Sequence, residues 1–345
     1  MVGLSFPEVL VRLTEGVDLS EGDAHDVMAQ VLAGDATPAQ IAGFLIAERS
    51  KGPTTEELCG MLRAMLDASE RVHLAADALD TCGTGGSRQR REAAFNVSTV
   101  AALVVAGAGA KVCKHGNRRA SATSGSADLL EALGVTIDVG PAGVAKCVEE
   151  AGIGFCLAPR FHPGMRHPGP VRRELGVATV FNLLGPMANP ARVKRQVIGV
   201  VDGGIAEKVV QVLKSNGAER AMVVYGHDGL DELTTAATST VVELRDGEVH
   251  SFDVDPTSLG LTHVQSAPAG GDTAANVELV RRLLDGEPGA HRDIVLLNAA
   301  AGLVVAAVAD DLKSALEAAV ASVGGGRAAG ALDRLAAVSK DAADL

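Results

Sequence analysis

Residues 78–107 read ALDTCGTGGSRQRREAAFNVSTVAALVVAG, and this stretch decides which kind of fold to expect. Residues 78–81 form a short strand candidate, and three glycines follow within residues 83–86. A helix rich in Ala and Val is predicted from about Val97. A strand, a glycine loop and a helix in this order indicate an α/β unit whose loop leads towards a helix N-terminus.

The same alternation continues along the chain. Buried-strand candidates lie at residues 110–113, 155–158, 197–201 and 221–225, and helices such as 205–215 fall between them. This pattern predicts a largely parallel sheet. Segments 240–244 and 249–252 flank Asp246-Gly247, a hairpin signal, so some antiparallel pairing is also expected. The tail from Asn276 onward is again mostly helical.

The first 70 residues predict helices only. Ser5, Ser20, Thr37 and Thr54 stand where helix N-caps are expected, and strand-like alternation is absent from the segments that follow them. We therefore predict a small helical domain over residues 1–73 and a larger α/β domain over 74–345. The length of 345 residues agrees, since one domain usually holds ~100–200. The Pro- and Gly-rich stretch 158–190 is expected to cross between the two.

Composition excludes several classes of protein. Hydrophobic residues make up 47% of the chain and charged residues 21%, so a sizeable core is available. The net charge of −12 and the 2% of aromatic residues disfavour nucleic-acid binding. The longest apolar stretches, near 97–110 and 296–309, fall short of the ~18 residues that a membrane span needs. Five cysteines without CxxC spacing, and the early charges of Glu8, Arg12 and Glu15, indicate a cytoplasmic protein with reduced thiols and no signal peptide.

The loop at residues 82–87 has the chemistry of a phosphate site. Glycines allow close approach of the backbone, whose N–H groups can cradle phosphate oxygens. The helix after it starts near Asn96-Val97-Ser98-Thr99, where the positive end of the helix dipole and polar side chains also favour an anion. The alternative is a tight turn followed by an ordinary N-cap.

A second loop, KHGNRRAS at residues 114–121, follows the strand candidate at 110–113. Its cations, glycine and hydroxyl groups suit a diphosphate, and Ser124-Gly125-Ser126 comes soon after. The alternative is a solvated basic loop. That alternative is weaker for Lys114, which stands at the end of an apolar strand, where α/β sheets bind ligands. His115 alone is more often a packed or surface histidine than a catalytic one.

An acidic segment, residues 225–233, follows another buried strand. Asp231 and Glu232 are hard oxygen ligands suited to Mg²⁺ shared with substrate phosphates, or else the acidic first turn of a helix. Three strand-end loops with these groups form a coherent diphosphate–Mg²⁺ site. Neither a Walker motif nor GxGxxG occurs, which disfavours an ATPase or a dinucleotide-binding domain.

Taken together, these residues resemble the anthranilate phosphoribosyltransferase family over almost the whole chain. The resemblance implies transfer of a 5-phosphoribosyl group from 5-phosphoribosyl 1-diphosphate to the amine of anthranilate in tryptophan biosynthesis. The motifs that carry it are Gly83-Thr84-Gly85-Gly86, Phe95-Asn96-Val97-Ser98-Thr99, Lys114-His115-Gly116-Asn117-Arg118, Gly125-Ser126-Ala127-Asp128, Arg172-Arg173-Glu174-Leu175-Gly176, Phe181-Asn182-Leu183-Leu184-Gly185-Pro186 and Asp228-Gly229-Leu230-Asp231-Glu232.

The resemblance also implies a fold and an assembly. The expected fold class is α/β, with a small N-terminal helical domain and a larger domain built on a mostly parallel mixed sheet, like that of nucleoside phosphorylases and phosphoribosyltransferases. The helical domain is expected to take in about residues 168–184. A cytoplasmic homodimer formed through the helical domains is implied as well, with no nucleic-acid or membrane partner.

The site residues implied by the resemblance fall into three groups. One Mg²⁺ is expected at Ser98 and another at Asp231 and Glu232. Anthranilate is expected near Gly83, His115, Asn117, Pro159, Met165 and Arg172, where Arg172 meets its carboxylate. The ribosyl donor is expected to meet Gly83, Gly85, Gly86, Ser87, Asn96, Ser98, Thr99, Lys114, His115, Gly116, Asn117, Arg118, Ser121 and Ser126.

The implied mechanism needs no general acid or base. The aromatic amine of anthranilate is already neutral at pH 7, so positioning and stabilisation of the departing diphosphate by Mg²⁺ and Lys114 would carry catalysis. The chain departs from the family's usual pattern in two places. Ser87 stands where an Asp is usual, followed by a longer loop with Arg88, Arg90, Arg91 and Glu92, and Ala122 replaces a hydroxyl residue. An enzyme with altered donor affinity is expected.

Three other functions remain open at this stage. They are a paralogue with a different acceptor, a pyrimidine nucleoside phosphorylase, and a non-catalytic protein that binds the ribosyl donor. Asn117, Arg172 and the segment 182–186 favour anthranilate as the acceptor.

Overall fold

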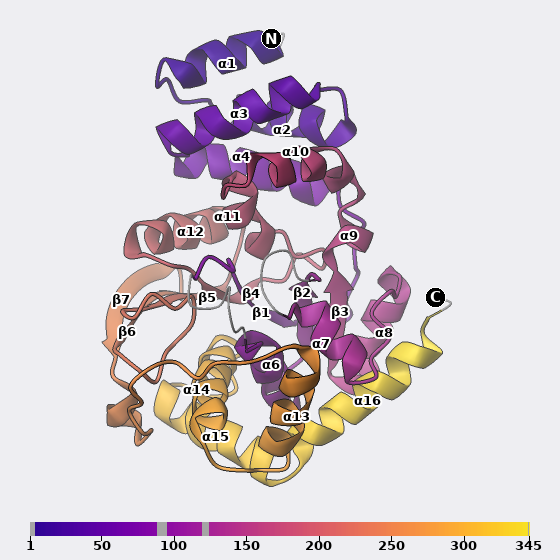
Figure 1. The fold of residues 1–345 in the computed structure, drawn as a ribbon, viewed down its shortest axis with the longest axis vertical. Helices are drawn as coiled ribbons and strands as arrows, with labels where there is room; N and C mark the ends of the chain where they lie inside the picture. The colour runs from indigo at the N-terminus through magenta and orange to yellow at the C-terminus, as the bar shows by residue number, and fades with distance from the viewer. Residues whose placement is uncertain (1–3, 88–94, 119–123, 344) are drawn as a thin grey trace.

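A seven-stranded mixed sheet forms the centre of the molecule (Figure 1). The structure is a computed structural model that describes residues 4–87, 95–118, 124–343 and 345. Strands β3, β2, β1, β4 and β5 are parallel, and β6 and β7 continue the sheet in antiparallel pairing. In sheet order they are β3 (Ile153–Leu157), β2 (Val112–Gly116), β1 (Leu79–Gly83), β4 (Arg195–Gly199), β5 (Arg220–Gly226), β6 (Ser239–Arg245) and β7 (Glu248–Val254).

Helices cover both faces of the sheet and enclose two apolar cores. Neighbouring residues of one strand point to opposite faces, so Val197 joins one core and Ile198 the other. The first core lies under α6 (Val97–Gly107), α7 (Ser126–Ala132), α8 (Pro141–Ala151), α13 (Thr273–Leu284), α14 (Ala290–Val305), α15 (Leu312–Gly324) and α16 (Arg327–Asp341). The second joins the sheet to α1 (Phe6–Thr14), α2 (Glu21–Ala33), α3 (Pro38–Lys51), α4 (Thr55–Asp67), α10 (Pro168–Leu175), α11 (Val180–Met187) and α12 (Gly203–Ser215).

The helical N-terminus predicted from the caps is confirmed. The hydroxyl of Ser20 accepts a hydrogen bond from the Asp23 N–H at 3.1 Å, and Thr37 and Thr54 cap α3 and α4 in the same way. In Figure 1 these helices form a bundle at the top of the molecule, and α10 lies among them. Helix α10 packs on α3, and α11 packs on α3 and α4. The fold class is therefore as expected, whereas the boundary at residue 73 and the assignment of 168–184 stay predictions.

The hairpin and the mostly parallel sheet are also confirmed. Asp246 and Gly247 both have positive φ, at 53° and 79°, as a two-residue turn between twisted strands requires. Three short segments, α9 (Ala158–Phe161), η1 (Pro163–Arg166) and η2 (Pro256–Leu259), complete the described elements. Among the described residues, no helix combines the length and apolar character needed to cross a membrane.

Two expectations about the ends of strands need correction. Strand β2 continues to Gly116, so Lys114 and His115 lie within the strand and not in the loop after it. The reason is backbone pairing with β3, in which Lys114 lies opposite Phe155 and His115 opposite Cys156. The acidic segment at 228–233 forms turns and bends and no helix, which removes the alternative of a helix N-terminus.

A buried acid in the helical bundle makes stability depend on pH. Glu48 on α3 has no exposed surface, and neither of its carboxylate oxygens has a hydrogen-bond partner in the described part of the chain. Burial raises its pKa to about 7, and the charges of Glu57 and Asp18 add to the shift against the opposing Lys51. The folded state thus holds a proton that the unfolded state releases at a lower pH.

We predict that Glu48→Gln stabilises the protein above neutral pH. Because the pKa of Glu48 is raised on folding, wild-type stability falls as pH rises from about 4.5 through about 7. The neutral amide lacks this dependence, so the variant melts roughly 2–6 °C higher at pH 8 and no higher at pH 4. Thermal melts from pH 4 to 8 measure this. The exposed Glu56→Gln serves as a control, and equal pH slopes for Glu48→Gln and wild type would contradict the assignment.

Candidate active site at the carboxyl ends of the parallel strands

The acidic loop after β5 meets the glycine loop after β1. The N–H of Gly85 donates to Oδ2 of Asp231 at 2.7 Å, although the two residues lie 146 positions apart. Gly83 faces the same carboxylate, since a Cβ there would lie 3.1 Å from Oδ2. A Cβ at Gly199, the last residue of β4, would overlap the carbonyl oxygen of Asp231. Two glycines on neighbouring strands therefore make room for the acidic loop.

A buried amide on α14 holds the acidic loop from the other side. Asn298 accepts from the N–H of Leu233 at 3.1 Å and donates to the carbonyl of the same residue at 2.8 Å. Asp231 has no exposed surface and Glu232 is 4% exposed. The backbone beside the two carboxylates is thus fixed to the core.

Lys114 on β2 contacts both β1 and the start of α6. Its side chain is 2% exposed, and its ammonium group donates to the carbonyl of Thr81 on β1 and to Oγ of Ser98 at 3.4 Å. Ser98 and Thr99 lie in the first turn of α6. The cation therefore lies where the end of β1 meets a helix N-terminus, a position suited to an anionic ligand.

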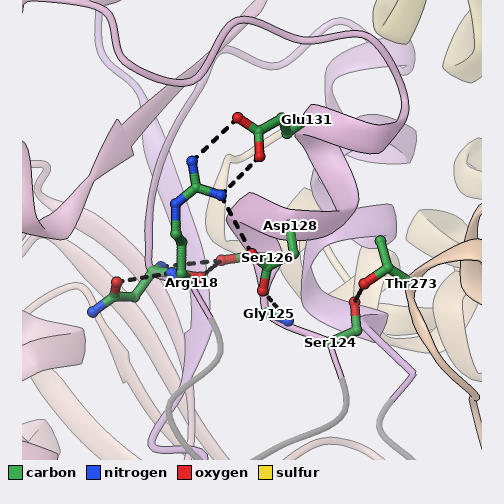
Figure 2. Close-up of polar contacts among 8 residues, drawn as sticks. Arg118, Ser124, Gly125, Ser126, Asp128, Glu131 and Thr273 are labelled. Atoms are coloured by element: carbon green, nitrogen blue, oxygen red, sulfur yellow. Dashed lines mark hydrogen bonds and ion pairs between the residues drawn. The ribbon is translucent and has the colours of Figure 1, made fainter.

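The second loop folds back on the start of α7 (Figure 2). Oγ of Ser126 accepts from the Asn117 N–H at 3.2 Å and donates to the Asn117 carbonyl at 3.1 Å. This approach needs glycine at 116, since a Cβ there would overlap Ser126 Oγ. The amide of Asn96 donates to the carbonyl of Ser124 at 3.2 Å, which ties the loop to the start of α6.

Arg118 points away from this site. Figure 2 shows its guanidinium group reaching α7, where it pairs with both carboxylate oxygens of Glu131 at 2.7 and 3.1 Å and with Asp128 at 3.4 Å. A phosphate contact by Arg118 would require exchange of the exposed Glu131 and the half-buried Asp128. Ser121, together with Arg88, Arg90, Arg91, Glu92 and Ala122, lies outside the described residues.

Buried polar atoms without partners gather around the loops. Native structures leave few such atoms, so a cluster of them points to a ligand. Ser87 illustrates this, since it is 1% exposed and its hydroxyl bonds no described residue. The others in this region of the described chain are Thr84 Oγ1, Asn96 Oδ1, Thr99 Oγ1, His115 Nε2 and His162 Nε2.

Two histidines lie in contact, His115 near the end of β2 and His162 between α9 and η1. The ring centroids of His115 and His162 are 5.0 Å apart, and both side chains are buried. Burial, with a smaller contribution from His162, lowers the pKa of His115 to about 3, and burial lowers the pKa of His162 to about 4. Both rings are therefore neutral at physiological pH and suited to polar or stacking contacts.

Arg172 faces inward from α10, while the adjacent Arg173 is exposed. The guanidinium carbon of Arg172 lies 5.2 Å from the ring centroid of Phe181, and Nη2 donates to Oδ1 of Asn182 at 3.4 Å. Helix α11 also carries Gly185, whose backbone bonds the ring of His115. Arg172 and His115 are thus linked through one helix. Met165 packs against the second core, which joins the sheet to the N-terminal helices. Pro159 is exposed on α9, directly after β3.

The carboxylate pair fits a magnesium ion. Among the described residues, no group of three His, Cys, Asp or Glu side chains could hold a metal. Asp231 and Glu232 supply two carboxylates, the kind of oxygen ligand that holds Mg²⁺ together with phosphate oxygens and water in many phosphate sites. Oγ of Ser98 accepts from the Lys114 ammonium group at 3.4 Å, and the ion expected at Ser98 stays a prediction.

Sequence reasoning missed several residues that hold this site together. They are Asp80, Asn189, His162 and Asn298. A polar residue predicted to be buried in a strand or an apolar helix is the one signal that could have indicated Asp80 and Asn298.

Fold and site together define a glycosyl transferase built from an α/β domain and a helical bundle. Residues 75–329 match the family described as "Glycosyl transferase family, a/b domain", and residues 7–69 match "Glycosyl transferase family, helical bundle domain". The chain belongs to the anthranilate phosphoribosyltransferase family. The enzyme of that name from Roseiflexus castenholzii is 49% identical over 333 residues, covering 96% of this chain and 97% of the relative.

Solved structures of this family are similar to the chain over almost its whole length. The anthranilate phosphoribosyltransferase of Thermus thermophilus is 39% identical with a TM-score of 0.89, covering 96% of this chain and 99% of that one. The enzyme from Saccharomyces cerevisiae in complex with PRPP and Mg is 28% identical with a TM-score of 0.86, covering 97% and 98%.

We predict that Gly199→Ala disrupts the acidic loop. The added methyl group overlaps the carbonyl of Asp231, so the loop must move or the strand must bend, at about 1–3 kcal/mol of the free energy of unfolding. Chemical denaturation measures the loss. Gly324→Ala, near the end of α15 with open space around it, is the matched control and should be neutral. Equal stability of the two variants would refute this packing argument.

Proposed function

We propose that this chain transfers the 5-phosphoribosyl group of 5-phosphoribosyl 1-diphosphate to the amine of anthranilate, forming N-(5-phosphoribosyl)anthranilate and diphosphate. The family membership and the structure of the yeast relative with PRPP and Mg support this activity. The observation that carries the proposal is that two contacts lie at one edge of the sheet: Gly85 after β1 bonds Asp231 after β5, and Lys114 on β2 bonds Ser98 at the start of α6.

Each loop supplies different chemistry to the donor. The backbone N–H groups at Gly85 and Gly86 and the start of α6 would bind phosphate oxygens. Lys114, already buried beside Ser98, would balance the negative charge that grows on the leaving diphosphate. Gly83, Ser87, Asn96, Thr99, Gly116, Asn117 and Ser126 complete the proposed donor site, and Ser121 remains a prediction from the sequence.

Asp231 and Glu232 would hold Mg²⁺ against the diphosphate. Bound there, the ion supplies charge neutralisation to the leaving group. The protein's own contribution is to fix the Asp231 carboxylate through Gly85 and the backbone beside Glu232 through the clamp of Asn298 on Leu233. No side chain is assigned as a general acid or base, because the attacking aromatic amine is already neutral and needs no deprotonation before it attacks. The C1–N bond forms as the C1–O bond to diphosphate breaks, and the proton that the nitrogen then loses goes to solvent or to the departing diphosphate.

Anthranilate would lie between the two histidines and α11. Arg172 is half-buried and oriented by Phe181 and Asn182, so its guanidinium group is preorganised for the carboxylate of anthranilate. The neutral rings of His115 and His162 offer surfaces for an aromatic acceptor. The yeast enzyme in complex with 4-fluoroanthranilate, 27% identical with a TM-score of 0.85, supports an aromatic acceptor of this kind.

A cytoplasmic homodimer joined through the helical bundle remains part of the proposal. The five cysteines are free, which suits a reducing compartment. Val11 on α1 and Ile46 on α3 are 54% and 38% exposed, and these two helices pack together. Sedimentation at micromolar concentration measures the assembly.

Loss of anthranilate fluorescence on addition of donor and Mg²⁺ tests the reaction. Turnover is expected. Donor binding in calorimetry without turnover would favour the paralogue or the non-catalytic protein. Phosphate-dependent cleavage of pyrimidine nucleosides would favour the phosphorylase.

We predict that Arg172→Ala raises the KM for anthranilate by roughly tenfold to a hundredfold and changes the KM for the donor little. The reason is the loss of a charged hydrogen bond to the carboxylate, worth about 1.5–3 kcal/mol. Steady-state kinetics with each substrate varied in turn measure the split. Arg173→Ala, one position along and exposed, should behave as wild type. An unchanged anthranilate KM in Arg172→Ala would reject this contact.

We predict that Asp231→Asn combined with Glu232→Gln lowers kcat by at least about a hundredfold and weakens the dependence on Mg²⁺. Both changes preserve shape and remove the charges that hold the cation. Activity titrated with MgCl₂ measures the effect. The exposed Glu219→Gln, which pairs with Lys194, is the control. Full activity of the double variant at low Mg²⁺ would remove this metal site from the mechanism.

A further inference from the structure

Strands β1 and β2 separate towards the active site. β1 pairs with β4 along all five of its residues. With β2, by contrast, it pairs at one position, Leu79 opposite Val112, near the start of both strands. Beyond that point the side chain of Asp80 enters the space between the strands. Asp80 has no exposed surface, and its Oδ1 accepts from the backbone N–H of His115 at 3.2 Å. The carboxylate of Asp80 thus accepts the hydrogen bond that a backbone carbonyl of a paired strand would otherwise accept.

Asn189, from the segment after α11, completes the link. Its amide nitrogen donates to Oδ2 of Asp80 and to the carbonyl of Cys113, both at 2.8 Å. Its oxygen accepts from the N–H of Ala191 at 2.9 Å, so the 1%-exposed side chain uses all of its main hydrogen-bonding groups. The two backbone groups that flank Lys114 are therefore both held, Cys113 by Asn189 and His115 by Asp80.

The charge of Asp80 also matches that of Lys114. Burial raises the pKa of Asp80 to about 6, while Lys114, Asn189 and the His115 N–H oppose the shift. A buried cation without a nearby anion is strongly unfavourable. The carboxylate therefore offsets the desolvation of a lysine that is itself 2% exposed.

We propose that Asp80 and Asn189 form a positioning pair that orients and charge-balances Lys114 for the ribosyl diphosphate. The inference rests on the proposed function, and it assigns a role to two residues that touch no substrate. The pair fixes the lysine backbone on both sides, and the ammonium group is then directed at Thr81 and Ser98. Donor affinity and the departure of the diphosphate should depend on the pair, and anthranilate affinity should not.

A double-mutant cycle with Lys114→Met tests this role. Asp80→Asn and Asn189→Ala should each lower kcat/KM for the donor roughly tenfold or more and leave the anthranilate KM within about twofold. In the Lys114→Met background, Asp80→Asn should lower kcat/KM less than about threefold further, because the residue it serves is gone. Independent, multiplicative losses would overturn the proposal. So would full donor kcat/KM in folded Asp80→Asn or Asn189→Ala.

A second readout does not depend on activity. Lys114→Met leaves the buried Asp80 without its cation, so adding Asp80→Asn should raise the melting temperature of that variant, whereas the same change in wild type should lower it. Loss in both backgrounds would overturn the charge pairing. Ser339→Ala, a remote buried hydroxyl that accepts from the Thr136 N–H, should lower stability without changing donor kinetics. If Ser339→Ala lowered kcat/KM for the donor as much as Asp80→Asn does, the effect of Asp80 would be explained by a loss of general stability.

The outcomes separate this proposal from the proposed function. An inactive wild type would refute the function. The double-mutant cycle would then be measured through the Kd for the donor, by calorimetry, and through the melting temperature. An active wild type with additive cycles would refute only the positioning pair.

Discussion

The hydrogen bond from the Gly85 N–H to the carboxylate of Asp231 is the contact on which the site depends. It joins the loops after β1 and β5, which lie on either side of β4 in the sheet. Buried carboxylates are costly unless bonded, and this backbone donor bonds the carboxylate of Asp231 in the acidic loop. The absence of side chains at Gly83 and Gly199 permits the approach. Close packing of the backbone thus allows the buried carboxylates to lie at this edge of the sheet.

At the same edge, strands β1 and β2 separate. β1 keeps its ladder with β4 and leaves β2 after the first pair, and polar side chains fill the space that results. Lys114 lies in that space as the buried cation beside a helix N-terminus. The proposed anion-binding groups and the acidic loop therefore belong to one sheet edge, whereas Arg172, proposed to bind the acceptor, lies on α10, which packs on α3.

Local patterns predicted the elements well and their long-range partners poorly. The caps at Ser20, Thr37 and Thr54 and the turn at Asp246-Gly247 are local signals, and the helices and the hairpin follow from them. The end of β2 was predicted too early because polar residues such as Lys114 resemble a loop until the pairing with β3 is known. Asp80–Asn189 and Arg118–Glu131 depend on folded geometry that spacing does not encode. The family motifs predicted the site residues, and the fold shows which contacts support them.

A crystal structure of the protein with 5-phosphoribosyl 1-diphosphate and Mg²⁺ tests the account most directly. The account predicts diphosphate density between the Gly85 loop, the start of α6 and Lys114, with a metal ion on the carboxylates of Asp231 and Glu232. Donor density elsewhere on the molecule, or a metal ion that contacts neither carboxylate, would contradict it.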